Sequence, residues 1–259
     1  MAGRHKLIEN AALGMLLLAF VMLWLPLGQH GFLIEHWMKV GTFMAPFLLL
    51  IAFSFRSHGE LQSNPRVLSL FMLVAYIVHQ FEEHWVDLYG STYAFKPYLN
   101  RFLSSVTAQQ GDSEFMSDTS VFVINTSLVW LVGALAIWRG SKHIFASLCM
   151  AAIVVVNAIS HIVASFIAGR YNPGLLSAVL LFVPLGVAVY LQLWRTRGAS
   201  VRLVIASLVW GLLAHVILIG GILAMRQFEW LSEPVYYIAL IAWSLVPAFA
   251  FPSHTSTAP

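Results

Sequence analysis

Long apolar runs recur along almost the whole chain and are separated by short polar segments. A helix needs about 20 apolar residues to cross the hydrocarbon core of a bilayer, so each run is a candidate membrane span. The pattern predicts eight spans, or seven if the second or the last run lies only at the interface. The predicted spans are residues 11–28, 37–55, 66–84, 119–138, 144–168, 174–194, 201–224 and 234–251.

Turn-forming residues mark several of the limits. Asn64-Pro65 precedes the third run, Arg139-Gly140-Ser141-Lys142 separates the fourth from the fifth, and Arg170-Tyr171-Asn172-Pro173-Gly174 separates the fifth from the sixth. One connection is long, from about residue 87 to residue 118, and it is polar with Tyr and Phe interleaved. We interpret it as a solvated loop, with a lid or an amphipathic surface segment as the alternatives.

The composition agrees with a membrane protein. Of 259 residues, 59% are hydrophobic and 10% are charged, which is typical of an integral membrane protein. We therefore predict an all-α, polytopic transmembrane helix bundle that forms a single domain over residues 1–259. The net charge of +3 comes from short basic loops, which argues against nucleic acid as a partner. The single cysteine, Cys149, excludes an intrachain disulfide and a thiolate metal cluster.

The distribution of basic residues predicts the orientation in the membrane. Cytoplasmic loops carry an excess of Lys and Arg. If the N-terminus is cytoplasmic, nine of the 14 basic residues lie in cytoplasmic loops and five lie on the other side. We therefore expect a multi-pass protein with both termini in the cytoplasm.

Ionisable residues gather at one depth of this predicted bundle. His79, Glu82 and Glu83 are three and four residues apart near the outer end of the third span, so they share one helix face. The fifth span brings Asn157 and His161 to a comparable depth, again on one face. Ionisable groups in a membrane helix are costly and are found mainly where they pair, bind a ligand or line a polar cavity. This layer is therefore the candidate functional site.

Three motifs in this region resemble a known family. They are His79-x-x-Glu82-Glu83, the later His161 and Tyr171-x-Pro173-Gly174, in that order. Together they resemble the signature of the HXXEE family of membrane proteins, over a core of about residues 66–185. That family is described by its motifs and its activity is unassigned. The resemblance supports the choice of residues and implies nothing about the reaction.

The leading hypothesis is a metal site. Imidazole and carboxylate ligands suit a divalent metal such as zinc, iron or manganese, and the candidate ligands are His79, Glu82, Glu83 and His161. Glu82 or Glu83 is also a candidate general acid or base. Asn157 and Tyr171 are candidates for orienting groups around the reaction. A dinuclear site would in addition use Glu35, His36 and His215.

The same residues allow other functions. We expect an enzyme that acts on a membrane lipid or another apolar small molecule. Without a metal, neighbouring carboxylates and His161 could serve an acid–base isomerase or a cyclase of a prenyl or terpenoid substrate. In a third reading, the polar layer is the relay of a proton- or cation-coupled transporter. A purely structural role for the polar layer is the remaining alternative.

Overall fold

The structure is a computed structural model that describes residues 6–11, 14, 31–55, 63–107, 114–140 and 143–251. Within these ranges the chain is a bundle of helices without a β-strand. Two of the long helical segments contain a π-helical turn. In one, α5, η3 and α6 follow one another without a break, and in the other, α8, η4 and α9 do so. The elements are α2 (Gly31–Phe53), α3 (Pro65–His84), α4 (Phe95–Thr107), α5 (Asp118–Asn125), η3 (Thr126–Leu131), α6 (Val132–Arg139), α7 (Ile144–Ala168), α8 (Leu175–Ser177), η4 (Ala178–Phe182), α9 (Val183–Arg197), α10 (Val201–Arg226) and α11 (Glu233–Phe249).

Among the described residues, five helical segments are long and apolar enough to cross a membrane, and they correspond to the second and the fourth to seventh predicted spans. The third predicted span is helix α3, which carries the ionisable residues, and the last is the shorter helix α11. The first predicted span, residues 11–28, lies almost wholly outside the described residues. The all-α transmembrane bundle is thus confirmed, while the count of eight spans stays a prediction. The five segments are Ile34–Phe53, Asp118–Arg139, Ile144–Ala168, Leu175–Arg197 and Val201–Arg226.

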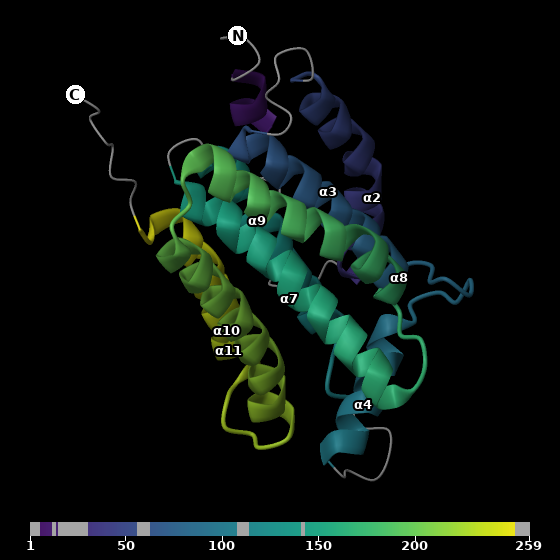
Figure 1. The fold of residues 1–259 in the computed structure, drawn as a ribbon. Helices are drawn as coiled ribbons and strands as arrows, with labels where there is room; N and C mark the ends of the chain where they lie inside the picture. The colour runs from purple at the N-terminus through teal and green to yellow at the C-terminus, as the bar shows by residue number, and fades with distance from the viewer. Residues whose placement is uncertain are drawn as a thin grey trace, which may run out of the picture.

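Helix α3 is the centre of the bundle. It packs against α2, α6 and α7, and almost all of its side chains are buried. Figure 1 shows α7 and α9 side by side across α3, with the α10–α11 pair on one flank. The start of α3 is fixed locally, because the side chain of Asn64 accepts a hydrogen bond from the backbone N–H of Arg66 (3.0 Å) and Pro65 occupies the first helical turn. The helix ends at His84, so its last two turns carry the candidate site residues.

Both described ends of the chain lie at the same end of the bundle. Arg66, at the start of α3, pairs with Glu9 (3.1 Å), and the ring of Phe251 contacts that of Phe145 at the start of α7. The guanidinium of Arg66 also donates to the backbone carbonyl of Trp138, close to the start of α7 in the chain. This arrangement is compatible with two termini on one side of a membrane. That this side is the cytoplasm stays a prediction.

The long connection after α3 is not the solvated loop that the sequence suggested. Residues Phe95–Thr107 form helix α4, with Tyr98, Leu99 and Leu103 buried and Arg101 exposed. The expectation of a loop is wrong here because the apolar residues recur at helical spacing, which gives the segment one apolar face. The alternative of an amphipathic surface segment describes α4 correctly. Its apolar face turns toward the site described below.

Helices α7 and α10 are in close contact at Gly211. A Cβ atom at this position would lie 2.9 Å from the Cβ of Ala152 and 3.1 Å from its backbone carbonyl carbon. A larger residue must therefore push the two helix backbones apart. We expect Gly211→Leu to lower the stability of the purified protein by about 1–3 kcal/mol, as overpacking usually does. The midpoint of thermal unfolding in detergent measures this change.

Gly220→Leu is the matched control, because it lies in the same helix and nothing would lie within 4 Å of its Cβ. Both changes raise helix propensity to the same extent. Equal unfolding midpoints for the two variants would contradict the close packing of α7 on α10.

Candidate metal centre

Three ionisable side chains converge between the ends of α3 and α7. His161 Nε2 lies 3.1 Å from Glu83 Oε1, and His79 Nε2 lies 3.4 Å from Glu83 Oε2. One ligand atom from each residue lies within 4.8 Å of the other two, and the three side chains are at most 6% exposed. Two imidazoles and a carboxylate thus form a buried group that could hold a metal ion.

Hydrogen bonds fix which nitrogen of each imidazole faces Glu83. The Ser177 hydroxyl donates its proton to Glu82 (2.5 Å), so it accepts from His79 Nδ1 at 2.8 Å. The amide of Asn172 donates to the backbone carbonyl of His161 (2.9 Å), so its oxygen accepts from His161 Nδ1 at 2.6 Å. Both Nδ1 atoms therefore carry a hydrogen, and both Nε2 atoms face Glu83.

Asn157 and His84 also contact this group. The amide nitrogen of Asn157 lies 2.6 Å from the Tyr76 hydroxyl and 3.2 Å from His79 Nε2. His84 Nε2 lies 3.5 Å from Glu83 Oε2. Asn157 is thus placed where the sequence expects a residue that orients the site.

Glu82 lies on the same face of α3 but has a different set of partners. Its Oε1 accepts hydrogen bonds from the Tyr171 hydroxyl (2.9 Å) and the Leu176 N–H (3.0 Å). Its Oε2 accepts from the N–H (2.8 Å) and the hydroxyl of Ser177. The carboxylate therefore fastens the segment from Tyr171 to Ser177 to α3. The group of possible metal ligands consists of His79, Glu83 and His161, without Glu82.

Tyr171 is consequently a partner of Glu82. Its hydroxyl donates to the Glu82 carboxylate and accepts from the backbone N–H of Leu88 (3.2 Å). Burial, and to a lesser degree the neighbouring carboxylates, raise the pKa of the Tyr171 phenol well above its ordinary value, so the hydroxyl remains a donor. Within the predicted set, Tyr171 positions the turn above the cluster.

Gly174 closes the turn directly over the cluster. Its φ of +96° lies in the region that favours glycine, and a Cβ here would lie 2.7 Å from His79 Cε1 and 2.8 Å from His161 Cε1. The same Cβ would lie 2.9 Å from Glu83 Cγ. A residue without a side chain therefore allows this turn to pack against all three members of the group.

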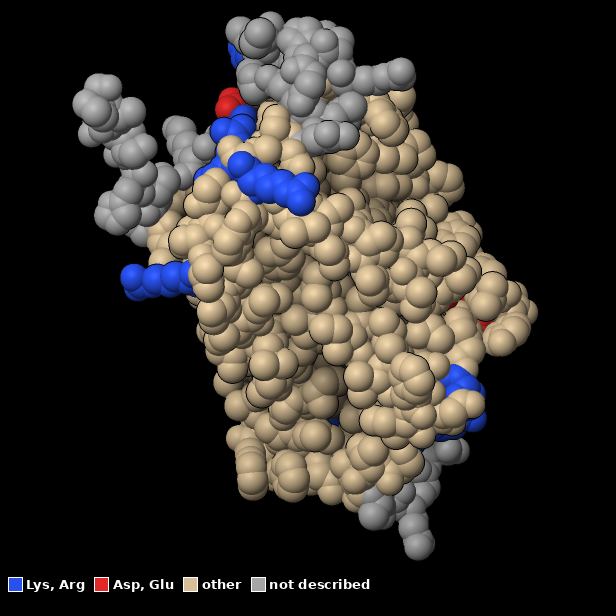
Figure 2. All heavy atoms as spheres, in the orientation of Figure 1, with Lys and Arg blue, Asp and Glu red and all other residues tan. Residues whose placement is uncertain are grey.

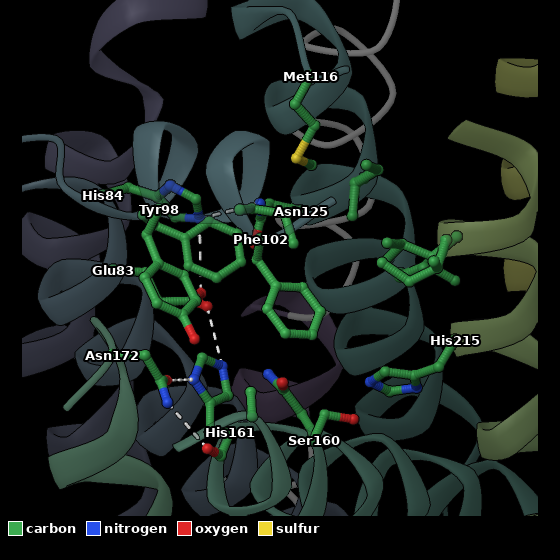
Figure 3. A pocket seen from close by; sticks show the side chains of 18 of the residues that line it. Glu83, His84, Tyr98, Phe102, Met116, Asn125, Ser160, His161, Asn172 and His215 are labelled. Atoms are coloured by element: carbon green, nitrogen blue, oxygen red, sulfur yellow. Dashed lines mark hydrogen bonds and ion pairs between the residues drawn. The ribbon is translucent and has the colours of Figure 1, made fainter. Parts of the chain in front are cut away.

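A cavity of about 280 Å³ adjoins the cluster. Figure 3 shows Glu83 and His161 on one side of it and His215 on the other. Most of the remaining wall is apolar or aromatic and comes from α4, the residues just before α5, α5 itself, η3, α7 and α10, including Phe95, Tyr98, Phe102, Met116, Leu128 and Ile219. A small apolar molecule bound here would contact the carboxylate and one imidazole of the cluster.

Three other candidate ligands lie elsewhere. Glu35 and His36 line a second cleft of about 510 Å³, near Lys96 and Asp118, and only His84 lines both this cleft and the cavity. His215 lies on the cavity wall, with its Nδ1 2.9 Å from the carbonyl of Gly211 in its own helix. In the part of the chain that the structure describes, these residues do not join the cluster, so a dinuclear centre is not assembled.

Sequence reasoning did not single out three residues of the site. Asn172 lies inside the turn that the sequence marked, and its position between Tyr171 and Pro173 could have indicated it. Ser177 follows the turn at the start of an apolar run, where a serine is common and gives no signal. Tyr98 lies in α4, and the amphipathic pattern of that segment was the available signal.

Comparisons with known proteins give one match. Residues 70–189 match a family model described as a protein of unknown function with HXXEE motif. No curated protein and no solved structure matches the chain. The matched segment contains the cluster, the turn above it, all of α7 and the first part of α9.

Replacing the Glu82 carboxylate should destabilise the protein. In Glu82→Gln, an NH₂ group must face two of the four donors that now surround the oxygens, and those buried donors lose their acceptor. We expect a loss of about 3 kcal/mol or more of unfolding free energy, measured by thermal or denaturant unfolding in detergent.

Glu114→Gln provides the comparison, because the Glu114 side chain is 61% exposed and pairs with Lys96 (2.8 Å) at the surface. A surface pair of this kind contributes less than about 1 kcal/mol. If the two variants unfold at the same temperature, the segment from Tyr171 to Ser177 is not held by Glu82.

Proposed function

We propose that this chain, whose residues 70–189 match the model of a protein family of unknown function with an HXXEE motif, is a metal-dependent integral membrane enzyme. A divalent metal would be held by His79, Glu83 and His161. The substrate would be a lipid or another apolar small molecule bound in the adjoining cavity.

The observation that carries this proposal is that two imidazole Nε2 atoms face one buried carboxylate. Both rings already donate from Nδ1, so each Nε2 meets Glu83 either with a hydrogen or with a lone pair. A lone pair and an anionic oxygen repel each other at such distances unless a cation lies among them, and a divalent metal would be that cation. Metal-bound histidines typically donate their other ring N–H to a protein acceptor, as His79 and His161 do here to Ser177 and Asn172.

The spacing also fits a metal ion. With bonds of about 2.0–2.2 Å and tetrahedral geometry, neighbouring ligand atoms lie about 3.3 Å apart. In the cluster, His161 Nε2 lies 3.1 Å from one oxygen of Glu83 and His79 Nε2 lies 3.4 Å from the other, and the three ligand atoms lie within 4.8 Å of one another. Two histidines and one carboxylate are the ligands of several catalytic zinc sites and of non-haem iron oxygenases. Zinc and iron(II) are therefore favoured over manganese, which prefers oxygen ligands.

The remaining residues have distinct roles in this proposal. A bound divalent ion would supply Lewis acidity to an oxygen of the substrate or of water. Glu83 and His161 lie on the cavity wall and would contact the substrate, and Asn157, which also lines the cavity, would orient the groups beside them. Glu82 and Tyr171 would keep the turn above the cluster in place.

A metal-free enzyme is the second candidate. Aromatic rings of Phe95, Tyr98 and Phe102 line the cavity, and such rings stabilise a developing carbocation. In this reading the Glu83–His161 pair would move a proton to or from a prenyl or terpenoid substrate during isomerisation or cyclisation. This mechanism requires a proton, instead of a metal, between the two residues.

Elemental analysis by mass spectrometry of the detergent-purified protein separates the two candidates. We expect about one zinc or iron ion per chain in the wild type and at least a tenfold lower content in His161→Ala and Glu83→Gln, because each loses one of three ligands. His215→Ala is the control and should retain the metal, since His215 lies across the cavity. Folded wild-type protein without metal would overturn the metal proposal in favour of the acid–base enzyme.

A second prediction concerns the turn above the cluster. Gly174→Ala should lower the metal content, because the new Cβ would displace His79, His161 and Glu83. Gly169→Ala is the matched control: its φ is also positive (+60°), but nothing lies within 4 Å of its Cβ. Both variants carry backbone strain, so only a selective loss of metal in Gly174→Ala supports the proposed site. Equal metal contents in the two variants would contradict it.

A further inference from the structure

The cavity lies where α7 and α10 move apart. The two helices touch at Ala152 and Gly211 and diverge from there toward the end that carries the cluster (Figure 1). Along α7, the cavity is lined by residues three or four positions apart, which lie on one face of the helix and begin just after Ala152. The residues of this stripe are Ile153, Asn157, Ser160, Ala164 and Ile167.

The outer part of this stripe faces the surroundings of the protein. Ser160 is exposed. Ile167 is 69% exposed, and Val163, which also lines the cavity, is 48% exposed. These residues belong to a helix that is apolar enough to span a membrane. Figure 2 shows the middle of this face without Lys, Arg, Asp or Glu. The cavity is therefore open toward the region that lipid chains would occupy.

Tyr98 supplies a polar group inside this apolar cavity. The residue is 8% exposed and lines the cavity from α4, together with Glu83 and His161 (Figure 3). Its hydroxyl has no hydrogen-bond partner among the described residues. A buried hydroxyl without a partner is costly, so a ligand atom that accepts its hydrogen would be stabilised. Burial raises the pKa of the Tyr98 phenol, which keeps it a donor.

The charges around the cluster indicate the chemistry of the ligand's polar end. With a divalent cation bound, its histidine ligands would be neutral and its charge would balance the two carboxylates, Glu82 and Glu83. The cluster itself would then carry no net charge, and the cation that acts on the Tyr98 phenol is Arg170, an exposed residue beyond the end of α7. A neutral hydroxyl or carbonyl group can accept from Tyr98 without introducing a further charge into the apolar cavity.

We propose that the cavity binds a neutral, single-chain amphiphile from the membrane. Its hydroxyl or carbonyl end accepts a hydrogen bond from Tyr98 beside Glu83 and His161, and its hydrocarbon chain leaves the protein between the outer halves of α7 and α10. This proposal rests on the proposed function, because it names the class of substrate on which the proposed enzyme would act. Tyr98 is then a specificity-determining residue of the site.

Binding of tritiated oleyl alcohol to the detergent-purified protein tests this proposal. We expect saturable binding near one molecule per chain in a scintillation proximity assay. Tyr98→Phe should weaken binding by about three- to tenfold, the usual effect of one lost hydrogen bond. Ala164→Phe should abolish binding because its ring would fill the opening, and Ser160→Trp is a second variant with the same expectation if Ala164→Phe does not fold. Ile159→Phe is the control and should bind as the wild type does, because Ile159 is exposed and does not line the cavity.

The metal content of the same preparations separates this proposal from the proposed function. Metal retained and oleyl alcohol lost in Ala164→Phe would support the lateral site. Metal present but no saturable binding in the wild type, or equal binding in Ala164→Phe and Ile159→Phe, would overturn it and leave the metal centre in place. If the wild type holds no metal but binds oleyl alcohol, and Ala164→Phe loses that binding, the lateral site is supported and the metal-dependent reaction is contradicted.

Discussion

The two oxygens of Glu82 accept four hydrogen bonds from one short stretch of chain, Tyr171 to Ser177, and the candidate site depends on this attachment. The stretch supplies Ser177, which sets the tautomer of His79, and Asn172, which sets that of His161. It also places Gly174 over both imidazole rings. A carboxylate that the sequence suggests as a ligand is thus the anchor of the segment that organises the ligands.

This arrangement follows from the cost of burying polar groups in an apolar bundle. Burying a donor or acceptor without a hydrogen-bond partner costs about 1–3 kcal/mol of folding free energy, and burying an unpaired charge costs more. The polar atoms at this end of α3 accordingly form a connected network: Gln80 accepts from the indole of Trp130 (2.9 Å) and donates to Asn125 (2.9 Å), which approaches His84 (3.3 Å). The network leaves few alternative rotamers for the residues around Glu83. Rigid ligands of this kind lower the cost of forming a metal site.

The packing of α7 also serves two purposes. At Ala152 it lies so close to α10 that only glycine fits opposite, and further along it brings His161 to α3 while it moves away from α10. The same divergence opens the cavity beside the cluster. The amphipathic helix α4 closes one side of that cavity with Tyr98 and Phe102. The cluster and the cavity beside it are therefore neighbouring consequences of one helix crossing.

The sequence by itself determined the helical class, most of the spans and the helix face that carries His79 and Glu83. These features depend on hydrophobic runs and on the helical repeat, which are local properties. It also indicated that His161 lies at the depth of His79, because alternating spans fix the depth of each residue in a bilayer. Only the tertiary structure decided that Glu82 binds the turn while Glu83 faces His79 and His161. The partners of two adjacent residues on one helix depend on which distant segments pack beside each of them. The roles of Ser177 and Tyr98 were likewise decided there: hydrogen bonds and cavity walls depend on which elements meet in space, and no local pattern encodes that.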